Sequence, residues 1–310
     1  MLFLDGVGIG KHDPSINPFF AARLPALSWL LGGMLPSLRH QHLSSRHATV
    51  VPLDATMGVE GLPQSGTGQT ALFTGMNGAK IIGKHFGPYP YSTLRPVIAE
   101  HNIFKRLVDA DKRPYFANAF PQRFFDYFEQ RKNRMTVTTL SYLLSGHELL
   151  KADDLFAGRG VSADITNQGW AALGYPALAI IQPEEAGRRL AELTRESDFV
   201  LFEYWKTDKA GHSRELKQAI EVLELFDAML AGIIQHLDLR KAILVVVSDH
   251  GNIEDLSTKA HTRHPIPAII HGRDHGRIAA HLHPPGNGPA AMLTAVTPAV
   301  LEVITRHPPH

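Results

Sequence analysis

Two pairs of acidic and imidazole side chains have spacings suited to metal binding. Asp208 and His212 are four residues apart, so on a helical turn both lie on the same side. Asp249 and His250 are adjacent, and the backbone at a strand end can turn enough to bring a carboxylate and an imidazole to one ion. The chemistry indicated by both pairs is the binding of a divalent cation.

Further candidate ligands lie elsewhere in the chain. Asp5 follows a short apolar run and precedes the glycines of Gly6-Val-Gly-Ile-Gly10, an order that suits a carboxylate presented at a strand end with room for a ligand. His261 and His264 both precede a predicted strand, and both could be ligands. Together with the two pairs, these side chains supply enough oxygen and imidazole ligands for two divalent metals.

The chain also offers a hydroxyl nucleophile. Small polar residues from Ser65 lead into a short apolar segment that closes on Gly75, which is typical of a helix with a glycine at its C-terminus. Ser65 would then lie at or just before the helix N-terminus, where N–H groups favour an anion and a hydroxyl can attack phosphorus or sulfur. Gly66 and Gly68 are small enough to let a phosphate approach. The competing nucleophiles are Thr67 and Thr70.

Each signal has an ordinary structural explanation as well. Asp249 and His250 also suit a polar loop after a strand, and Asp5-Gly6 suits a simple turn. Ser65 could serve only as a helix N-cap, and Asp208 as an acid at a helix start. The residues taken one by one leave these alternatives open.

Buried strands must position the candidate ligands. Residues 243–247 are five apolar, mostly β-branched residues that end at Ser248, which predicts a strand buried on both faces. Residues 1–4 and 198–205 also read as strands, and residues 183–193 and 214–237 as amphipathic helices. This alternation predicts an α/β fold, a three-layer sandwich with a mostly parallel central sheet. Such sheets place their sites at the carboxyl ends of the strands.

The middle of the chain has few strand patterns. We predict that residues 1–77 and 186–310 form the metal-binding α/β core, and that residues 78–185 are an inserted cap that binds substrate. Basic side chains of this segment are candidate anion contacts, although each also suits a solvated surface charge. They are Lys80, Lys84, His85, Arg95 and Arg123.

The composition excludes several classes of protein. A chain of 310 residues with 44% apolar and 20% charged residues is ordinary for a soluble globular protein. The net charge of +1 gives no strong field to attract nucleic acid or an anionic membrane. Without cysteine there is no disulfide and no thiolate metal site. No signal peptide or transmembrane segment is recognisable, so we expect a cytoplasmic location.

Several motifs in this order resemble those of a known family. They are Leu4-Asp-Gly6, Gly61-Leu-Pro followed by Ser65-x-x-Gly68, the D-x-x-x-H of Asp208, Ser248-Asp-His-Gly-Asn252, and the H-T-x-x-P-x-P that begins at His261. The sequence resembles the alkaline phosphatase superfamily of metalloenzymes, nearest to the branch of cofactor-independent phosphoglycerate mutase and phosphopentomutase. The resemblance covers residues 1–10, 61–75, 198–213, 243–272 and, more loosely, 297–301.

The resemblance implies roles for individual residues. One metal would be held by Asp208, His212 and His261, which is preferred to His264 because it opens the H-T motif. The second metal would be held by Asp5, Asp249, His250 and the hydroxyl of Ser65. Ser65 is the implied nucleophile because family nucleophiles lie ten residues before the glycine that ends this helix, here Gly75.

We therefore predict two-metal phosphoryl transfer through Ser65 on a small phosphate ester, as a phosphatase or a phosphomutase, with Mn²⁺ or Zn²⁺. The chain departs from the mutases in having Gln69 where they carry histidine, and its middle segment matches neither cap. The alternatives are a phosphodiesterase or sulfatase-like hydrolase on the same core, or a catalytically silent metal-binding protein. The sequence leaves the natural substrate and the oligomeric state open.

Overall fold

A seven-stranded sheet lies at the centre of the chain. The structure is a computed structural model that describes residues 1–130, 134–282 and 291–306. The strand order is β2-β3-β9-β8-β1-β7-β4. The strands are β2 (Leu43–Ser44), β3 (Ala48–Leu53), β9 (Ile266–His271), β8 (Leu244–Ser248), β1 (Leu2–Leu4), β7 (Phe199–Tyr204) and β4 (Pro114–Phe116).

The sheet is mixed but mostly parallel. Strands β8, β1, β7 and β4 are parallel to one another. Strand β9 is antiparallel to both β8 and β3, and β2 is antiparallel to β3. Five strands therefore run in one direction and only β9 and β2 run in the other, which confirms the predicted mostly parallel sheet.

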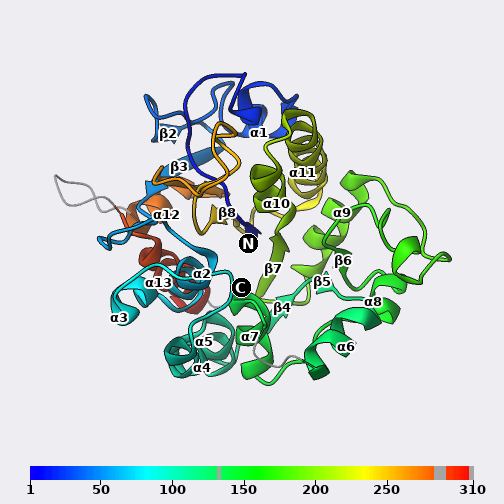
Figure 1. Cartoon of the computed structure of the whole chain (residues 1–310). Coiled ribbons are helices and arrows are strands. Elements are labelled where there is room, and N and C mark those ends of the chain that lie inside the picture. The colour runs from blue at the N-terminus through cyan, green and yellow to red at the C-terminus, as the bar shows by residue number, and fades with distance from the viewer. Residues whose placement is uncertain (131–133, 283–290, 307–310) are drawn as a thin grey trace.

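Helices cover both faces of the sheet (Figure 1). On one face lie α1 (Pro25–Leu30), α9 (Pro183–Leu193) and α11 (Leu216–His236). On the other lie α2 (Ser65–Thr74), α4 (Arg95–His101), α5 (Ile103–Val108), α7 (Val137–Leu144), α12 (His275–Leu282) and α13 (Val296–Arg306). The remaining helices are α3 (Gly78–Ile82), α6 (Gln122–Gln130), α8 (Ala152–Phe156) and α10 (Lys206–Ser213). The predicted three-layer α/β sandwich is confirmed.

The apolar strand sequences explain this layering. Side chains alternate between the faces of a strand, so a strand between two helical layers must be apolar at every position. In β1, Leu2 and Leu4 pack against the core under α9 and α11, whereas Phe3 packs on the opposite core. The Phe3 ring meets that of Phe73 in α2 edge-on, with 5.3 Å between the ring centroids.

The predicted cap segment contributes to the central sheet. Strand β4 comes from this segment and pairs with β7, and side chains between Leu94 and Tyr142 join the core around α2. Farther along, the two-stranded sheet of β5 (Asn118–Ala119) and β6 (Val161–Ser162) adjoins a small separate core that includes Leu155 and Trp170. The substrate-binding cap stays a prediction, and the structure adds that part of residues 78–185 packs on the main sheet.

None of the helices among the described residues combines the length and the apolar character that crossing a bilayer requires.

Candidate metal centre

The candidate ligands gather at the carboxyl ends of three neighbouring strands. Strand β1 lies between β7 and β8, with Leu4 in register with Tyr204 on one side and Ser248 on the other. Asp5 follows β1, Asp208 lies in α10 just after β7, and Asp249 follows β8. Because parallel strands end at the same edge of the sheet, residues more than 240 positions apart become neighbours there.

The first group, which we call the buried cluster, consists of Asp5, Asp249 and His250. One ligand atom from each residue lies within 4.8 Å of the others. The Nε2 atom of His250 is 3.3 Å from Asp5 Oδ1 and 3.6 Å from Asp249 Oδ2. The side chains of Asp249 and His250 are fully buried.

The second group, which we call the rim cluster, consists of Asp208, His212 and His261, again with ligand atoms within 4.8 Å of one another. The Nε2 atom of His212 is 3.3 Å from Asp208 Oδ2 and 3.2 Å from His261 Nε2. The two clusters adjoin, because the rings of His250 and His261 stack with centroids 3.8 Å apart. The structure thus brings the six residues together in the two groups that the resemblance implied, and their roles as metal ligands stay a prediction.

Ser65 is the hydroxyl that reaches the buried cluster. It is the first residue of α2, and its Oγ lies 3.0 Å from His250 Nε2. The two competing hydroxyls face their own helix instead, since Thr67 donates to the carbonyl of Gln64 and Thr70 to that of Gly66. His264 likewise lies outside the rim cluster and pairs with Glu254.

Atoms of both clusters have the chemistry to hold cations. Asp5 Oδ1 and Asp249 Oδ2 are buried without a hydrogen-bond partner. The Nδ1 atoms of His212 and His261 face the carbonyls of Lys259 and Pro63, at 2.9 and 2.7 Å. A neutral imidazole whose Nδ1–H donates to a carbonyl presents a lone pair at Nε2. Two such lone pairs 3.2 Å apart would be satisfied by a shared cation or by a proton on one of the two rings.

The pKa values show the same demand for positive charge. Burial, together with the Asp5 carboxylate, raises the pKa of Asp249 well above its usual range. Burial alone would lower the pKa of His250, but Asp249 and Asp5 raise it to about 10. In the rim cluster burial opposes ionisation of Asp208, yet the hydrogen bond from His212 and the charge of His250 hold its pKa at about 2. The proton on His250 therefore occupies a position that favours a cation.

The glycines after Asp5 do not leave open space for a ligand. A Cβ on Gly6, whose φ is +70°, would lie 2.6 Å from Asp208 Oδ1. A Cβ on Gly8 would overlap the Glu254 carboxylate, and one on Gly10 would lie 2.5 Å from the Glu254 carbonyl. The space beside these glycines is filled by the protein itself, so they serve close packing of the Asp5 loop, and room for a ligand at Asp5 stays a prediction.

The packing gives a reason for glycine at two positions of α2 that differs from the predicted one. A Cβ on Gly66 would overlap the carbonyl of Tyr89, and one on Gly68 would lie 2.7 Å from the carbonyl of Asp249. The N–H of Thr67 donates to the Phe86 carbonyl at 2.9 Å. These glycines let the 86–89 loop and the end of β8 approach the helix closely, and their expected role in admitting a phosphate is not what the packing shows.

The five basic residues proposed as anion contacts have contacts elsewhere or lie at the surface. Lys84 Nζ lies 5.9 and 5.4 Å from the ring centroids of Phe86 and Tyr91. His85 Nε2 is 3.3 Å from the carbonyl of Val59. The others lie in helices, Lys80 in α3, Arg95 in α4 and Arg123 in α6. Their role in binding substrate stays a prediction.

Three polar residues near the clusters were given no role in the sequence analysis. Asn252 Nδ2 donates to Asp208 Oδ1 at 2.6 Å, and Glu254 pairs with His264. Glu203 is buried in β7, where burial and the neighbouring Asp5 charge raise its pKa to about 8, so at neutral pH it adds little negative charge. The sequence held two signals for these residues. Glu203 is a lone acid inside an apolar strand, and Asn252 and Glu254 are polar residues shortly after His250.

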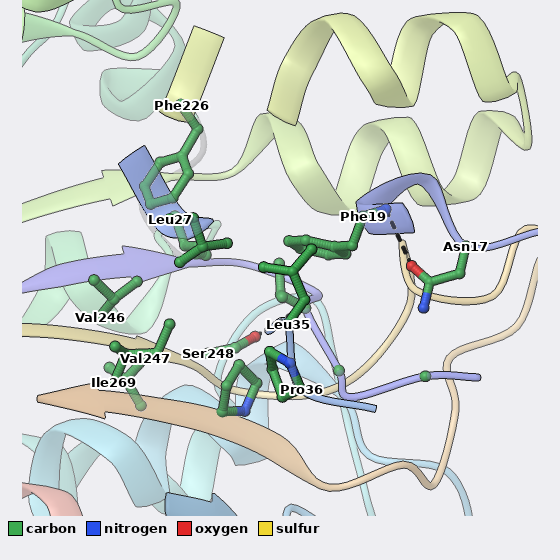
Figure 2. Close-up of a pocket in the computed structure, with 15 residues that line it drawn as sticks. Asn17, Phe19, Leu27, Leu35, Pro36, Phe226, Val246, Val247, Ser248 and Ile269 are labelled. Carbon is green, nitrogen blue, oxygen red and sulfur yellow. Dashed lines mark hydrogen bonds between the residues drawn. The ribbon is translucent and has the colours of Figure 1, made fainter. Parts of the chain in front are cut away.

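A cavity of about 40 Å³ lies behind the Asp5 loop, away from the ligand atoms. Figure 2 shows that apolar side chains, among them Leu27, Leu35, Phe226 and Ile269, line it. Ser248 also borders the cavity, and its hydroxyl accepts from the Val7 N–H and donates to the His250 carbonyl. An apolar space of this size suits core packing, so the candidate chemistry lies in the two clusters.

The sequence and the fold both match known proteins. The family model described as the Metalloenzyme superfamily matches residues 180–304. The 2,3-bisphosphoglycerate-independent phosphoglycerate mutase of Pyrococcus abyssi is 32% identical over 85 residues, which is 27% of this chain and 20% of that protein. The mutase of the same name from Pyrococcus furiosus is 24% identical over 156 residues, 50% of this chain and 34% of that protein.

The matches therefore span about a fifth to a third of these relatives. Among solved structures, the PH0037 protein from Pyrococcus horikoshii has a TM-score of 0.57 at 13% identity, covering 100% of this chain and 97% of that one. At this identity the likeness concerns the fold. Part of this chain is thus similar to the Metalloenzyme superfamily and to the 2,3-bisphosphoglycerate-independent phosphoglycerate mutases, and its fold is similar to that of the PH0037 protein.

Proposed function

We propose that this protein is an enzyme that transfers phosphoryl groups with two divalent metal ions and Ser65 as nucleophile, acting on a small phosphate ester. The observation that carries the proposal is the joint placement of two ligand clusters and one hydroxyl. Ser65 Oγ lies 3.0 Å from a ring nitrogen of the buried cluster, which is stacked on the rim cluster. The similarity to phosphoglycerate mutases supports the same chemistry.

The donor sets indicate which residues would hold the ions. Asp208, His212 and His261 would hold one, and Asp5, Asp249, His250 and the Ser65 hydroxyl the other. Imidazole mixed with carboxylate suits Mn²⁺ or Zn²⁺ better than Mg²⁺. When bound, two such ions stabilise the charge on the attacking, leaving and non-bridging oxygens of a phosphoryl group.

The position of Ser65 supports its role as the nucleophile. Because Ser65 is the first residue of α2, the helix and the overlying 86–89 loop hold its backbone, and its hydroxyl points into the buried cluster. In the proposed step the Ser65 Oγ–P bond forms, the ester P–O bond breaks, and the proton lost from the serine ends on the leaving alcohol. The phosphoserine then passes its phosphoryl group to water, as in a phosphatase, or back to the alcohol, as in a mutase.

The test is turnover of aryl phosphate monoesters and diesters, with phosphoglycerate as a further substrate, after loading with Mn²⁺ or Zn²⁺. Enzyme quenched in acid should carry phosphate on Ser65, because phosphoserine is stable in acid. Release of inorganic phosphate would indicate a phosphatase, and isomerised substrate a mutase. Preferential turnover of the diester would favour the phosphodiesterase alternative, and label on Thr67 or Thr70 would refute Ser65 as nucleophile.

A further inference from the structure

Glu254 is a buried carboxylate that takes no part in either cluster. Its side chain is fully buried and accepts four hydrogen bonds. Oε2 accepts from the backbone N–H groups of Gly8 and Asn252, at 2.8 and 2.7 Å. Oε1 accepts from the Thr262 hydroxyl and lies 3.0 Å from His264 Nδ1.

These partners belong to the three loops that carry four of the candidate ligands. Gly8 follows Asp5 by three residues, Asn252 follows His250 by two, and Thr262 is the neighbour of His261. The three loops are far apart in the sequence, and β1, β8 and β9 enter or leave them separately. One carboxylate thus joins the loops of the buried cluster to the His261 loop of the rim cluster.

The surrounding glycines show that the protein makes space for this carboxylate. A Cβ on Gly8 or on Gly251 would overlap Glu254 Oε1. A Cβ on Gly10 would lie 2.9 Å from Glu254 Cγ. Side chains at these positions would force the loops apart, so the glycines and Glu254 form one packed unit.

Glu254 is ionised within this unit. Burial by itself would raise its pKa, but the hydrogen bonds from His264 and Thr262 hold the pKa below its usual range. Losing a buried acceptor of four donors would leave two backbone N–H groups without partners, which is costly enough to move the loops.

We infer that Glu254 is a positioning residue that fixes the spacing of the Asp5, His250 and His261 loops and thereby sets the metal affinity of both clusters. The inference rests on the proposed two-metal function. Its physical basis is that groups behind metal ligands orient them, and that losing such a group commonly weakens metal binding by about 10- to 100-fold. Because Glu254 acts through the backbone of three loops, both ions should be affected.

The experiment measures Mn²⁺ and Zn²⁺ affinity by calorimetry for the full chain and for two variants. Glu254→Ala should bind both ions about 10- to 100-fold more weakly. Glu254→Gln keeps the shape and one carbonyl oxygen, so it should lose less. The visible spectrum of the Co²⁺-loaded protein should shift in Glu254→Ala, because that spectrum reports ligand geometry directly.

A matched control separates positioning from general stability. Asp227 of α11 is also a buried carboxylate, and it accepts from the N–H groups of Ala26 and Leu27, at 2.9 and 2.8 Å. Asp227→Ala should lower the melting temperature but keep the wild-type metal affinity and Co²⁺ spectrum. Equal weakening in Asp227→Ala and Glu254→Ala would overturn the inference.

The remaining outcomes distinguish failure of the positioning role of Glu254 from failure of the proposed two-metal function. Unchanged affinity and spectrum in Glu254→Ala would refute the positioning role and leave the two-metal function standing. Should Glu254→Ala fail to fold, Glu254→Gln decides, with weaker binding in support and wild-type binding against. Wild-type protein that binds neither ion would overturn the proposed function, and the inference with it.

Discussion

The buried and rim clusters have similar chemistry in different surroundings. Each combines carboxylate and imidazole, but the side chains of Asp249 and His250 are 0% exposed, whereas those of Asp208 and His212 are 20% and 45% exposed. In the buried cluster burial raises the pKa of Asp249, while in the rim cluster the pKa of Asp208 falls to about 2. At the rim the hydrogen bond from His212 outweighs burial and keeps Asp208 ionised, whereas burial opposes the charge of Asp249, so we expect the buried cluster to gain more from a bound cation.

The difference in exposure suggests that the two clusters have different roles. The buried cluster adjoins the hydroxyl of Ser65, whose Oγ lies 3.0 Å from the ring nitrogen His250 Nε2. The rim cluster is held in place by backbone carbonyls and by Asn252, and one of its ligands is open to solvent. We therefore expect the buried ion to be tightly held and the rim ion to exchange more readily.

The largest expected effect concerns the hydroxyl of the buried cluster. Ser65→Ala should lower kcat by about 10³-fold or more, because removing a nucleophile typically costs several orders of magnitude. Thr70→Ala is the control and should change kcat little, since the Thr70 hydroxyl already donates to the Gly66 carbonyl. Steady-state kinetics on an aryl phosphate is the measurement, and an active Ser65→Ala enzyme would contradict the assigned position of the nucleophile.

The next effect separates the two ions. Asp249→Ala should remove the buried ion and His261→Ala the rim ion, each leaving about one metal equivalent per chain in place of two. Elemental analysis after dialysis measures the stoichiometry, and circular dichroism checks the fold. Full metal content in both variants would show that the clusters are not metal sites.

A chelator should remove the two ions at different rates. The exposed rim ion should leave first and the buried ion more slowly, giving two phases when a coloured chelator is mixed with the loaded protein. Since the ions bind only the folded protein, their removal should also lower the melting temperature by several degrees, given that ligand at 100 times its Kd contributes about 2.7 kcal/mol. Release of all the metal in a single fast phase, with no change in melting temperature, would contradict the proposed difference between the clusters.

The smallest expected effect comes from removing a hydrogen bond that supports only the rim cluster. Asn252→Ala removes the hydrogen bond to Asp208 Oδ1 and should weaken binding of the rim ion by about tenfold. The buried ion should keep its affinity, because the described hydrogen bonds of the Asn252 side chain reach only Asp208. Titration with Zn²⁺ would measure the affinity for the rim ion. The slower phase of release to a chelator would show whether the buried ion is still held as in the wild type.

The sequence by itself determined much of the arrangement of strands and helices, and its motifs predicted which residues gather in the two clusters. Apolar runs such as 243–247 specify buried strands because their burial is local and continuous. The D-x-x-x-H motif places the candidate ligands Asp208 and His212 within one helical turn, and Asp249 and His250 are adjacent at one strand end. Such motifs are short enough for local geometry to bring their side chains together.

Only the tertiary structure decided what fills the space between these motifs. Glu254 meets Gly8 across 246 positions, and Gly66 meets the carbonyl of Tyr89, so neither glycine shows its reason locally. The same holds for β4, which lies within residues 78–185 and pairs with β7 in the central sheet. These contacts depend on how separate strands and loops pack, and packing between distant segments leaves no periodic pattern in the chain.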